Sequence, residues 1–322
     1  MTTIAQSDAR PASALDVLAR QICNHFRKNG VYWLMALPGV SLIFLFAYAP
    51  LPGIAIAFKN YKFNLGIWGS EWVGFSNFGY LFATRLTGRV LFNTLFMNAL
   101  FIVTSTVAGV ILALLMNEVH HKLRARFYQS AMFFPSFISA VVISYFTLAF
   151  LSSDTGLVNR LIARLGGEPV PWYASPEYWP VILTLINLWK TAGFGSILYL
   201  AGMLAINPEY YEAAKIDGAS KLKQIRYITL PLITPILVVT TLLAIGRIMY
   251  ADFGLFYVVT RNTPQLYPTT DVIDTFVFRS LRQLGDLGMA AAAGFMQSVV
   301  GFVLVILSNL IVRRIDPDKA LF

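Results

Sequence analysis

Long apolar runs without Asp, Glu, Lys or Arg are the feature that most constrains the fold of this 322-residue chain. A bilayer core of about 30 Å needs about 20 apolar residues to be crossed by one helix. Six runs are long enough, the fifth interrupted by Lys190 alone; they cover residues 29–58, 90–117, 127–153, 287–312, 179–206 and 227–246. The chain therefore has to satisfy its backbone polar groups inside lipid.

Only helices and closed barrels satisfy those groups in a bilayer, and the runs lack the two-residue alternation of barrel strands. We predict an all-α polytopic membrane protein. Its domain over residues 29–315 follows a segment 1–28 and precedes a tail 316–322. Its six transmembrane helices are expected at about 31–57, 90–116, 127–151, 179–206, 231–250 and 287–312. Pro50 and Pro52 should end the first helix, because proline removes a backbone donor.

Composition supports the same class of protein. Hydrophobic residues make up 57% of the chain and charged residues 13%, about half the usual charged share of a soluble domain. The formal net charge of +9 is equally typical of a nucleic-acid binder and of a membrane protein with cationic cytoplasmic loops. Cys23 is the single cysteine, which excludes an internal disulfide and a cysteine metal cluster.

The distribution of Lys and Arg predicts the orientation. With the N-terminus inside, the inner segments 1–28, 118–126, 207–230 and 313–322 hold 14 Lys and Arg in 71 residues. The outer segments hold 10 in 99 residues. Since cytoplasmic loops are the more cationic, both termini are expected in the cytoplasm of the cell.

The segment 1–28 is too long and polar for a cleavable signal peptide. Its apolar residues recur at helical spacing, as Leu15, Leu18, Ile22 and Phe26. Two interpretations stay open: an amphipathic helix on the membrane surface, or a frayed tail.

The inner segment 207–230 predicts a short helix, a turn and a second helix. Asn207 is a natural N-cap, and Pro208 suits the first helical position. Gly218 can turn the chain through a positive φ, and Ser220 is expected to cap the second helix. Pro231 should then begin the fifth membrane helix.

This segment resembles the EAA loop of ABC-importer permease subunits. The match consists of Glu212-Ala213-Ala214, three residues, Gly218, nine residues, Ile228, one residue and Leu230-Pro231. At ordinary amino-acid usage such a match arises by chance at about 10⁻⁸ of start sites. The alternative is a surface hairpin without a special role. The resemblance implies that Glu212, Ala213, Ala214, Asp217 and Gly218 contact an ATP-binding subunit.

Further motifs resemble the complex-carbohydrate branch of the same family, including permease subunits of bacterial alginate importers. They are Trp72-Val73-Gly74-Phe75-Ser76-Asn77-Phe78, Asn93-Thr94, Leu114-Leu115-Met116-Asn117-Glu118, Phe134-Pro135-Ser136-Phe137-Ile138-Ser139 and Trp189-Lys190. The resemblance implies the type I importer fold in a bacterial inner membrane. It also implies a second permease, two ATP-binding subunits that hold ATP and Mg²⁺, an extracytoplasmic solute-binding protein and a carbohydrate substrate.

Other classes of function have weaker signals. The chain has no P-loop and no H-E-x-x-H motif, and no nucleophile–base set is visible, so we expect no catalysis by this chain. His120 and His121 lie in a basic loop, where solvation is a better explanation than a metal site. An ion-coupled secondary transporter is the alternative, but such carriers usually need a carboxylate within the membrane, and only Asp252 lies near a span.

The expected substrate path rests on polar side chains in or near the spans. They are Lys190, Asn187, Tyr145, Tyr250, Arg247, Asp252 and Asn98. Lys190 either lines a cavity, where its ammonium would favour an anionic saccharide, or snorkels or pairs with a partner subunit's carboxylate. The tyrosine and amide side chains either bind sugar or form helix–helix hydrogen bonds. Ala290, Gly294 and Ser298 predict tight packing by the last helix.

Overall fold

The computed structural model describes residues 14–82, 85–317 and 320, and most side chains within them. Among these residues, five helices are long and apolar enough to cross a membrane, and a sixth apolar run forms a bent helix pair. The chain divides into two units, Met1–Ala55 and Ile56–Phe322, and each is described by itself.

The first unit is helical from residue 14. Helix α1 (Ala14–Ile43) is kinked at Asn29 and continues into a short π-helical segment, η1 (Phe44–Tyr48). A turn at residues 49–50 separates it from the 3₁₀ segment η2 (Leu51–Phe58), where Pro50 and Pro52 were expected to end the helix. The side chains of residues 14–27 lie outside the described set, so the amphipathic character of this segment stays a prediction.

The second unit begins with a small cap of short elements, which is followed by long helices. The cap elements are β1 (Lys59–Asn60), α2 (Gly66–Gly69), β2 (Glu71–Trp72) and α3 (Ser76–Phe82), with β1 and β2 antiparallel. The helices that follow are α4 (Arg85–Asn117), α5 (Lys122–Phe133), α6 (Ala140–Leu151), α7 (Leu157–Arg164), α8 (Trp179–Leu204), α9 (Pro208–Ile216), α10 (Lys221–Gln224), α11 (Leu230–Gly246), α12 (Tyr267–Thr270), α13 (Ile273–Leu284) and α14 (Leu287–Ile315). Short 3₁₀ or π segments are η3 (Phe134–Phe137), η4 (Trp172–Ala174), η5 (Pro176–Tyr178), η6 (Ile225–Thr229), η7 (Gly254–Val259) and η8 (Pro264–Leu266).

The third predicted helix, over 127–151, is not continuous. The chain bends by 94° between α5 with η3 and the following α6. Ile138 and Ser139 have extended backbone there, and the Ser139 hydroxyl accepts a hydrogen bond from the Val142 amide as the N-cap of α6. Two extended residues interrupt the helical hydrogen bonds, and the cap satisfies one of the freed donors of the new helix.

The fifth predicted helix also differs in its bounds. Helical structure runs without a break from Lys221 through η6 to Gly246, rather than over 231–250. Pro231 therefore lies inside this helical run, at the second position of α11. Residues 247–252 beyond it have turn and irregular structure, which places the side chains expected near this helix end on a non-helical segment.

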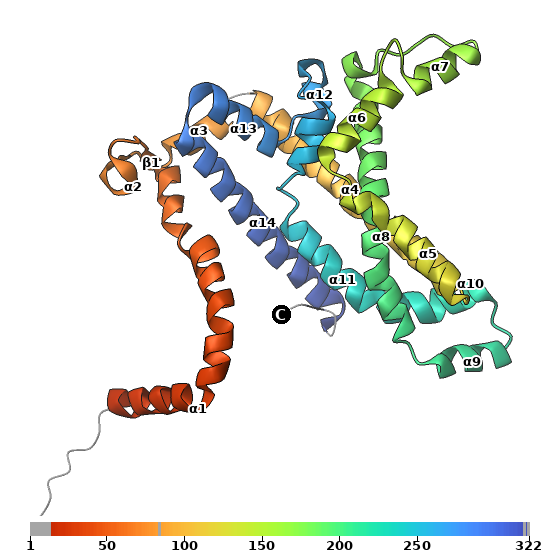
Figure 1. The fold of residues 1–322 in the computed structure, drawn as a ribbon, viewed down its shortest axis with the longest axis horizontal. Coiled ribbons are helices and arrows are strands. Elements are labelled where there is room, and N and C mark those ends of the chain that lie inside the picture. Colours follow the sequence, from red (N-terminus) through yellow and green to blue (C-terminus); the bar gives the residue numbers. More distant parts are fainter. Residues whose placement is uncertain (1–13, 83–84, 318–319, 321–322) are drawn as a thin grey trace, which may run out of the picture. The chain divides into compact units, whose positions relative to one another are not determined.

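Helices α4 and α8 lie side by side along much of their lengths, and α11 packs against α14 (Figure 1). The closest approach of α11 and α14 is at Gly246 and Gly301, where a Cβ on Gly301 would lie 2.4 Å from the Gly246 carbonyl oxygen. Gly294 makes no such contact within this chain, because a Cβ there would meet no atom within 4 Å, so the tight packing predicted for this stripe stays a prediction. The helices diverge from the Gly246–Gly301 contact toward the other end of α11.

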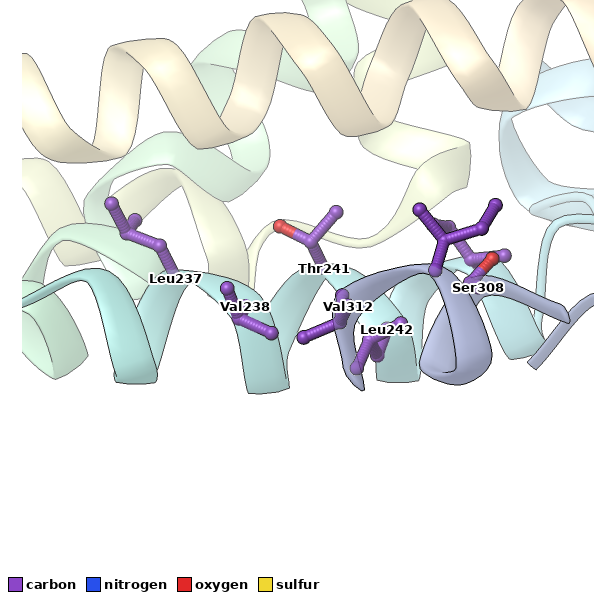
Figure 2. A pocket seen from close by; sticks show the side chains of 8 residues that line it. Leu237, Val238, Thr241, Leu242, Ser308 and Val312 are labelled. Carbon is purple, nitrogen blue, oxygen red and sulfur yellow. The ribbon is translucent and has the colours of Figure 1, made fainter. Parts of the chain in front are cut away.

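That divergence leaves an apolar crevice of about 370 Å³ between α11 and α14. Figure 2 shows its walls, which carry two hydroxyls, on Thr241 and Ser308, among aliphatic side chains such as Leu237 and Val312. An apolar crevice between two membrane helices suits a lipid chain or a neighbouring helix better than a sugar.

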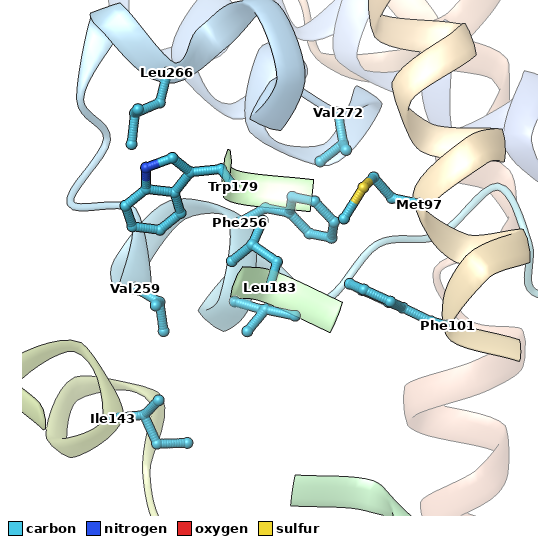
Figure 3. Packing of buried hydrophobic residues seen from close by; sticks show 10 residues of the cluster. Met97, Phe101, Ile143, Trp179, Leu183, Phe256, Val259, Leu266 and Val272 are labelled. Carbon is cyan, nitrogen blue, oxygen red and sulfur yellow. The ribbon is translucent and has the colours of Figure 1, made fainter. Parts of the chain in front are cut away.

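The largest buried cluster joins α4, α6 and α8 to the segments between α11 and α13 (Figure 3). Its members are Met97, Phe101, Ile143, Trp179, Leu183, Leu255, Phe256, Val259, Leu266 and Val272. The Trp179 indole nitrogen donates to the Trp172 carbonyl oxygen over 2.8 Å. This core fixes the irregular segments of one end of the unit, while α9 and α10 lie at the opposite end of α8 (Figure 1).

Candidate functional site

A polar cavity of about 550 Å³ lies between α4, α8, α11 and residues 247–252. Five of the seven side chains predicted for the substrate path line it, namely Asn98, Asn187, Arg247, Tyr250 and Asp252. Most of its remaining wall is apolar, with hydroxyls from residues such as Ser105 and Thr240. The structure therefore brings together groups that lie up to 154 positions apart in the chain.

The amide groups of the cavity hold its walls together. The Asn98 side-chain nitrogen donates to the carbonyl oxygens of Ile248 and Tyr250, at 2.8 and 3.2 Å. The Asn187 side-chain nitrogen donates to the Ser105 hydroxyl over 3.2 Å. Asn98 thus ties α4 to the segment after α11, and Asn187 ties α8 to α4. Of the two roles predicted for these amides, sugar binding and helix–helix hydrogen bonding, the contacts in the structure are of the second kind.

Lys190 forms an ion pair with Asp252 at the edge of the cavity. The ammonium nitrogen lies 3.3 Å from Asp252 Oδ2, with the lysine side chain 23% exposed and the aspartate 45% exposed. Asp252 Oδ1 accepts from the Leu255 amide over 3.1 Å. The expected carboxylate partner of Lys190 is therefore in the same chain. Asp252 lines the cavity, whereas Lys190 is not among the residues that line it.

Residues 249–252 are fixed from behind by two side chains that the sequence did not indicate. Asp274 Oδ2 accepts from the Ala251 amide over 2.8 Å, and the Gln297 side-chain nitrogen donates to the Met249 carbonyl oxygen over 2.7 Å. Burial raises the pKa of the Asp274 carboxyl above its usual range, and hydrogen bonds from Ala251 and Gln297 lower it in part. Neither residue lies in a motif, so only the fold could reveal them.

Tyr250 completes the contact between this segment and α14. Its hydroxyl lies 2.6 Å from the Ser298 hydroxyl, and the Ser298 hydroxyl donates to the Gly294 carbonyl oxygen over 3.0 Å. Ser298, one residue of the small-residue stripe, thus joins α14 to the segment that follows α11.

Tyr145 is not part of this cavity. It lies on α6, 63% exposed, with the Arg261 guanidinium carbon 5.9 Å from its ring centroid. Tyr145 follows the 94° bend before α6 and is not among the residues that line the cavity.

The 207–230 loop has the local structure that its sequence predicts. The Asn207 side-chain oxygen accepts from the Glu209 amide over 3.1 Å, and Gly218 has a φ of +74° at the end of α9. The Ala219 amide closes the turn on the Ala214 carbonyl oxygen over 2.8 Å. Ser220 occupies the N-cap position of α10, but its side chain forms no capping hydrogen bond.

The residues predicted to contact another subunit are accessible on this loop. Glu212, Ala213, Asp217 and Gly218 are exposed, and Ala214 is half-buried. Two large apolar side chains that the motif did not single out project beside them: Ile216 is 87% exposed and Leu222 is 79% exposed.

Two side-chain pairs attach the loop to the neighbouring helices. The Tyr211 hydroxyl lies 2.9 Å from the Thr229 hydroxyl, which links α9 to η6. The Lys221 ammonium lies 2.9 Å from both carboxylate oxygens of Glu118, at the end of α4. These contacts join α9 to η6 and α10 to the end of α4.

At the other end of the unit, the remaining motifs organise the loops. The Asn77 side-chain nitrogen donates to the carbonyl oxygens of Ala57 and Lys59. The Asn93 side-chain nitrogen donates to the Asp271 carbonyl oxygen, and the Ile273 amide donates to the Thr94 hydroxyl. These side chains substitute for regular secondary structure, which explains why the motifs are polar in a hydrophobic chain.

Metal binding has no support within the part of the chain that the structure describes. No group of three or more His, Cys, Asp or Glu side chains is close enough there to hold an ion. His121 occupies the exposed position before α5, as expected for a solvated loop.

Residues 105–317 match the model of the binding-protein-dependent transport system inner membrane component. The chain belongs to this family. The permease is 36% identical over 286 residues to the polygalacturonan/rhamnogalacturonan transport system permease protein YteP of Bacillus subtilis, covering 89% of this chain and 88% of that protein. It is 27% identical over 288 residues to the sulfoquinovosyl glycerol transport system permease protein SmoG of Agrobacterium fabrum, covering 87% of each.

Two solved structures share the fold of the permease. One is a bacterial ABC transporter involved in the import of the acidic polysaccharide alginate, with a TM-score of 0.82, 33% identity and coverage of 92% of this chain and 99% of that one. The other is a bacterial alginate ABC transporter in complex with a periplasmic protein bound to an alginate pentasaccharide, with a TM-score of 0.81 and 34% identity over 91% of this chain and 97% of that one. The type I importer fold and the resemblance to alginate importer permeases are confirmed.

Proposed function

We propose that this permease is the membrane subunit of an ATP-driven importer of oligo- or polysaccharides, with acidic saccharides such as alginate as the preferred class. The names of the relatives support a saccharide, and the two structural neighbours import alginate. The chain would supply the translocation path and would hydrolyse no ATP itself.

The polar cavity is the observation that carries this proposal. Sugar recognition needs aromatic faces and groups that hydrogen-bond hydroxyls, and the cavity presents Tyr250, the two asparagines and several hydroxyls. Its lining also includes one exposed cation, Arg247, and the one lining carboxylate, Asp252, is paired with Lys190. A wall with an excess of positive charge favours an anionic sugar over a neutral one.

The 207–230 loop would be the surface that receives ATP-binding subunits. In the full transporter this permease would pair with a second permease, two subunits that bind ATP and Mg²⁺, and an extracytoplasmic binding protein. Exposed Glu212, Ala213 and Ile216 support a docked partner. This loop and both chain termini would then lie in the cytoplasm.

Uptake by the reconstituted transporter tests the proposal. We expect proteoliposomes that contain the complete transporter to accumulate an acidic oligosaccharide only when ATP is supplied on the side of the membrane where the ATP-binding subunits lie. Glu212→Lys should abolish uptake and weaken co-purification of the ATP-binding subunits. Glu168→Lys makes the same charge change on the exposed loop after α7 and should leave both unchanged. Uptake that needs an ion gradient and no ATP-binding subunit would instead support a secondary transporter.

A further inference from the structure

In the ion pair at the cavity edge, the two carboxylate oxygens of Asp252 have different partners. Asp252 Oδ1 accepts from the Leu255 amide at the start of η7, whereas Oδ2 faces the Lys190 ammonium at 3.3 Å. One oxygen therefore anchors the side chain to its own segment. The other can leave the lysine without loss of that anchor.

The two partners also differ in access to the cavity. Asp252 is 45% exposed and lines it, whereas Lys190 is 23% exposed and is not among the lining residues. A cation in a membrane span is costly without a counter-charge, so Lys190 needs a carboxylate at all times. A neutral ligand that displaced Asp252 would leave the lysine unpaired. A ligand with its own carboxylate would not.

Resting on the proposed function, we propose that Asp252 is an internal stand-in for a substrate carboxylate, and that an acidic sugar replaces it on Lys190. The exchange trades one carboxylate for another, so no charge is left unpaired. Lys190 and Asp252 together are then the specificity-determining pair of the cavity. Arg247, which has no carboxylate within ion-pair distance among the described residues, adds a solvent-screened attraction for anions that does not depend on this exchange.

The structural consequence follows from where the two residues lie. Lys190 is on α8, and Asp252 is on the segment between α11 and η7. The pair is thus a link between these two parts of the cavity wall. Its replacement by a sugar carboxylate releases that link only when an acidic substrate is present.

The test measures the weak binding of sugars to the transporter complex in the absence of its solute-binding protein. The probes are trigalacturonate and its methyl ester, which share hydroxyl patterns and differ in charge, titrated by saturation-transfer NMR against the transporter in nanodiscs. We expect the wild type to bind the acid at least about tenfold more tightly than the ester, as for a hydrogen bond to a charged group. Lys190→Met with Asp252→Asn leaves no unpaired charge and should bring the two dissociation constants within about twofold.

Asp252→Asn alone gives the sharper outcome. Because it removes the competing carboxylate and keeps the lysine, the acid should bind several-fold more tightly and the ester should be unchanged. Arg164→Met removes an exposed cation on α7, remote in sequence from the cavity lining, and serves as the charge control with the wild-type ratio. Two results would overturn the proposed exchange. One is an equal change in the dissociation constants of acid and ester in Asp252→Asn; the other is a double variant that keeps the wild-type ratio of these two constants.

Failure of the proposed function would look different. A wild-type transporter that binds neither sugar and takes up no saccharide with ATP contradicts saccharide import itself. A wild type that imports saccharides but binds acid and ester equally contradicts only the role of the Lys190–Asp252 pair.

Discussion

At the scale of single residues, two buried polar groups, the Tyr173 hydroxyl and the Asp274 carboxyl, affect the stability of the loop end of the bundle. The Tyr173 hydroxyl has no hydrogen-bond partner among the described residues, although its ring packs edge-on against Trp179 at 5.0 Å. Burial raises the pKa of the Tyr173 phenol to about 12, with a smaller lowering by Arg261. Tyr173 therefore contributes to the fold through the packing of its ring and not through its hydroxyl.

We therefore expect Tyr173→Phe to stabilise the protein. An unsatisfied buried polar group costs about 1–3 kcal/mol, so its removal should raise the free energy of unfolding by about 1 kcal/mol. Thermal unfolding in detergent measures the change in melting temperature. Tyr178→Phe, at an exposed neighbouring ring, should have no effect. A lower melting temperature for Tyr173→Phe would show that the hydroxyl contributes a bond.

The Asp274 carboxyl predicts a pH dependence of stability. Its folded-state pKa lies above the ordinary value of 3.8, so its contribution favours the folded state at acid pH and is lost as the pH rises through the folded-state pKa. Asp274→Asn keeps an oxygen acceptor for the Ala251 amide and removes the charge. This variant should be more stable than the wild type near neutral pH.

Melting temperatures measured between about pH 4 and pH 7 check this sign. The melting temperature of the wild type should fall as the pH rises over that range, and that of Asp274→Asn should fall less. The exposed Asp154→Asn serves as the control for removing one negative charge. A variant whose stability falls as steeply as that of the wild type would contradict the assignment to Asp274.

At the scale of helices, the contact between α5 and α8 depends on Gly193. A Cβ on this residue would lie 2.0 Å from the Met132 carbonyl oxygen, whereas a Cβ on Gly195 would meet nothing within 4 Å. Gly193→Ala must therefore separate α5 from α8. Gly195→Ala, two residues along the same helix, provides the matched control.

We expect Gly193→Ala to lose several kcal/mol of stability, as overpacking in a close helix contact does, with a lower yield of folded protein. Gly195→Ala should match or slightly exceed the wild type, because alanine favours helix more than glycine does. Size-exclusion profiles and melting temperatures of the two variants give the comparison. Equal behaviour would mean that α5 and α8 are not in backbone contact.

The helices also show which parts of the fold are readable from sequence. Charge-free runs predicted the positions of α4, α8 and α14 closely, because burial in lipid is a property of composition along the chain. The bend at Ile138 and Ser139 was missed, since both residues are compatible with an apolar helix. Asn98, Arg247 and Asp252 were found as polar groups near spans, but Asp274 and Gln297 act through backbone contacts across the fold, which no local pattern encodes.

At the scale of the whole transporter, Gly218 tests whether the 207–230 loop transmits motion. A Cβ there would meet no atom within 4 Å, so substitutions act through the φ of +74° alone. Asn tolerates this conformation, and valine does not. Gly218→Val should distort the turn and abolish ATP-driven uptake, and Gly218→Asn should retain most of it.

Uptake is compared with co-purification of the ATP-binding subunits for both variants. Equal uptake by the Val and Asn variants would show that the turn geometry of the loop is irrelevant to transport. Loss in both would point to the space occupied by the side chain, for example at a docked subunit.

The bend between α5 and α6 has a consequence for how the nascent chain becomes a membrane protein. Helix α6 has 12 residues and a length of about 18 Å, too short to cross the bilayer core. Insertion must therefore recognise 127–151 as one stretch during synthesis. The packing of α5 is completed only later, because the Met132 carbonyl lies against Gly193, which is synthesised about 60 residues afterwards. The final surroundings of α5 thus depend on a helix made after it.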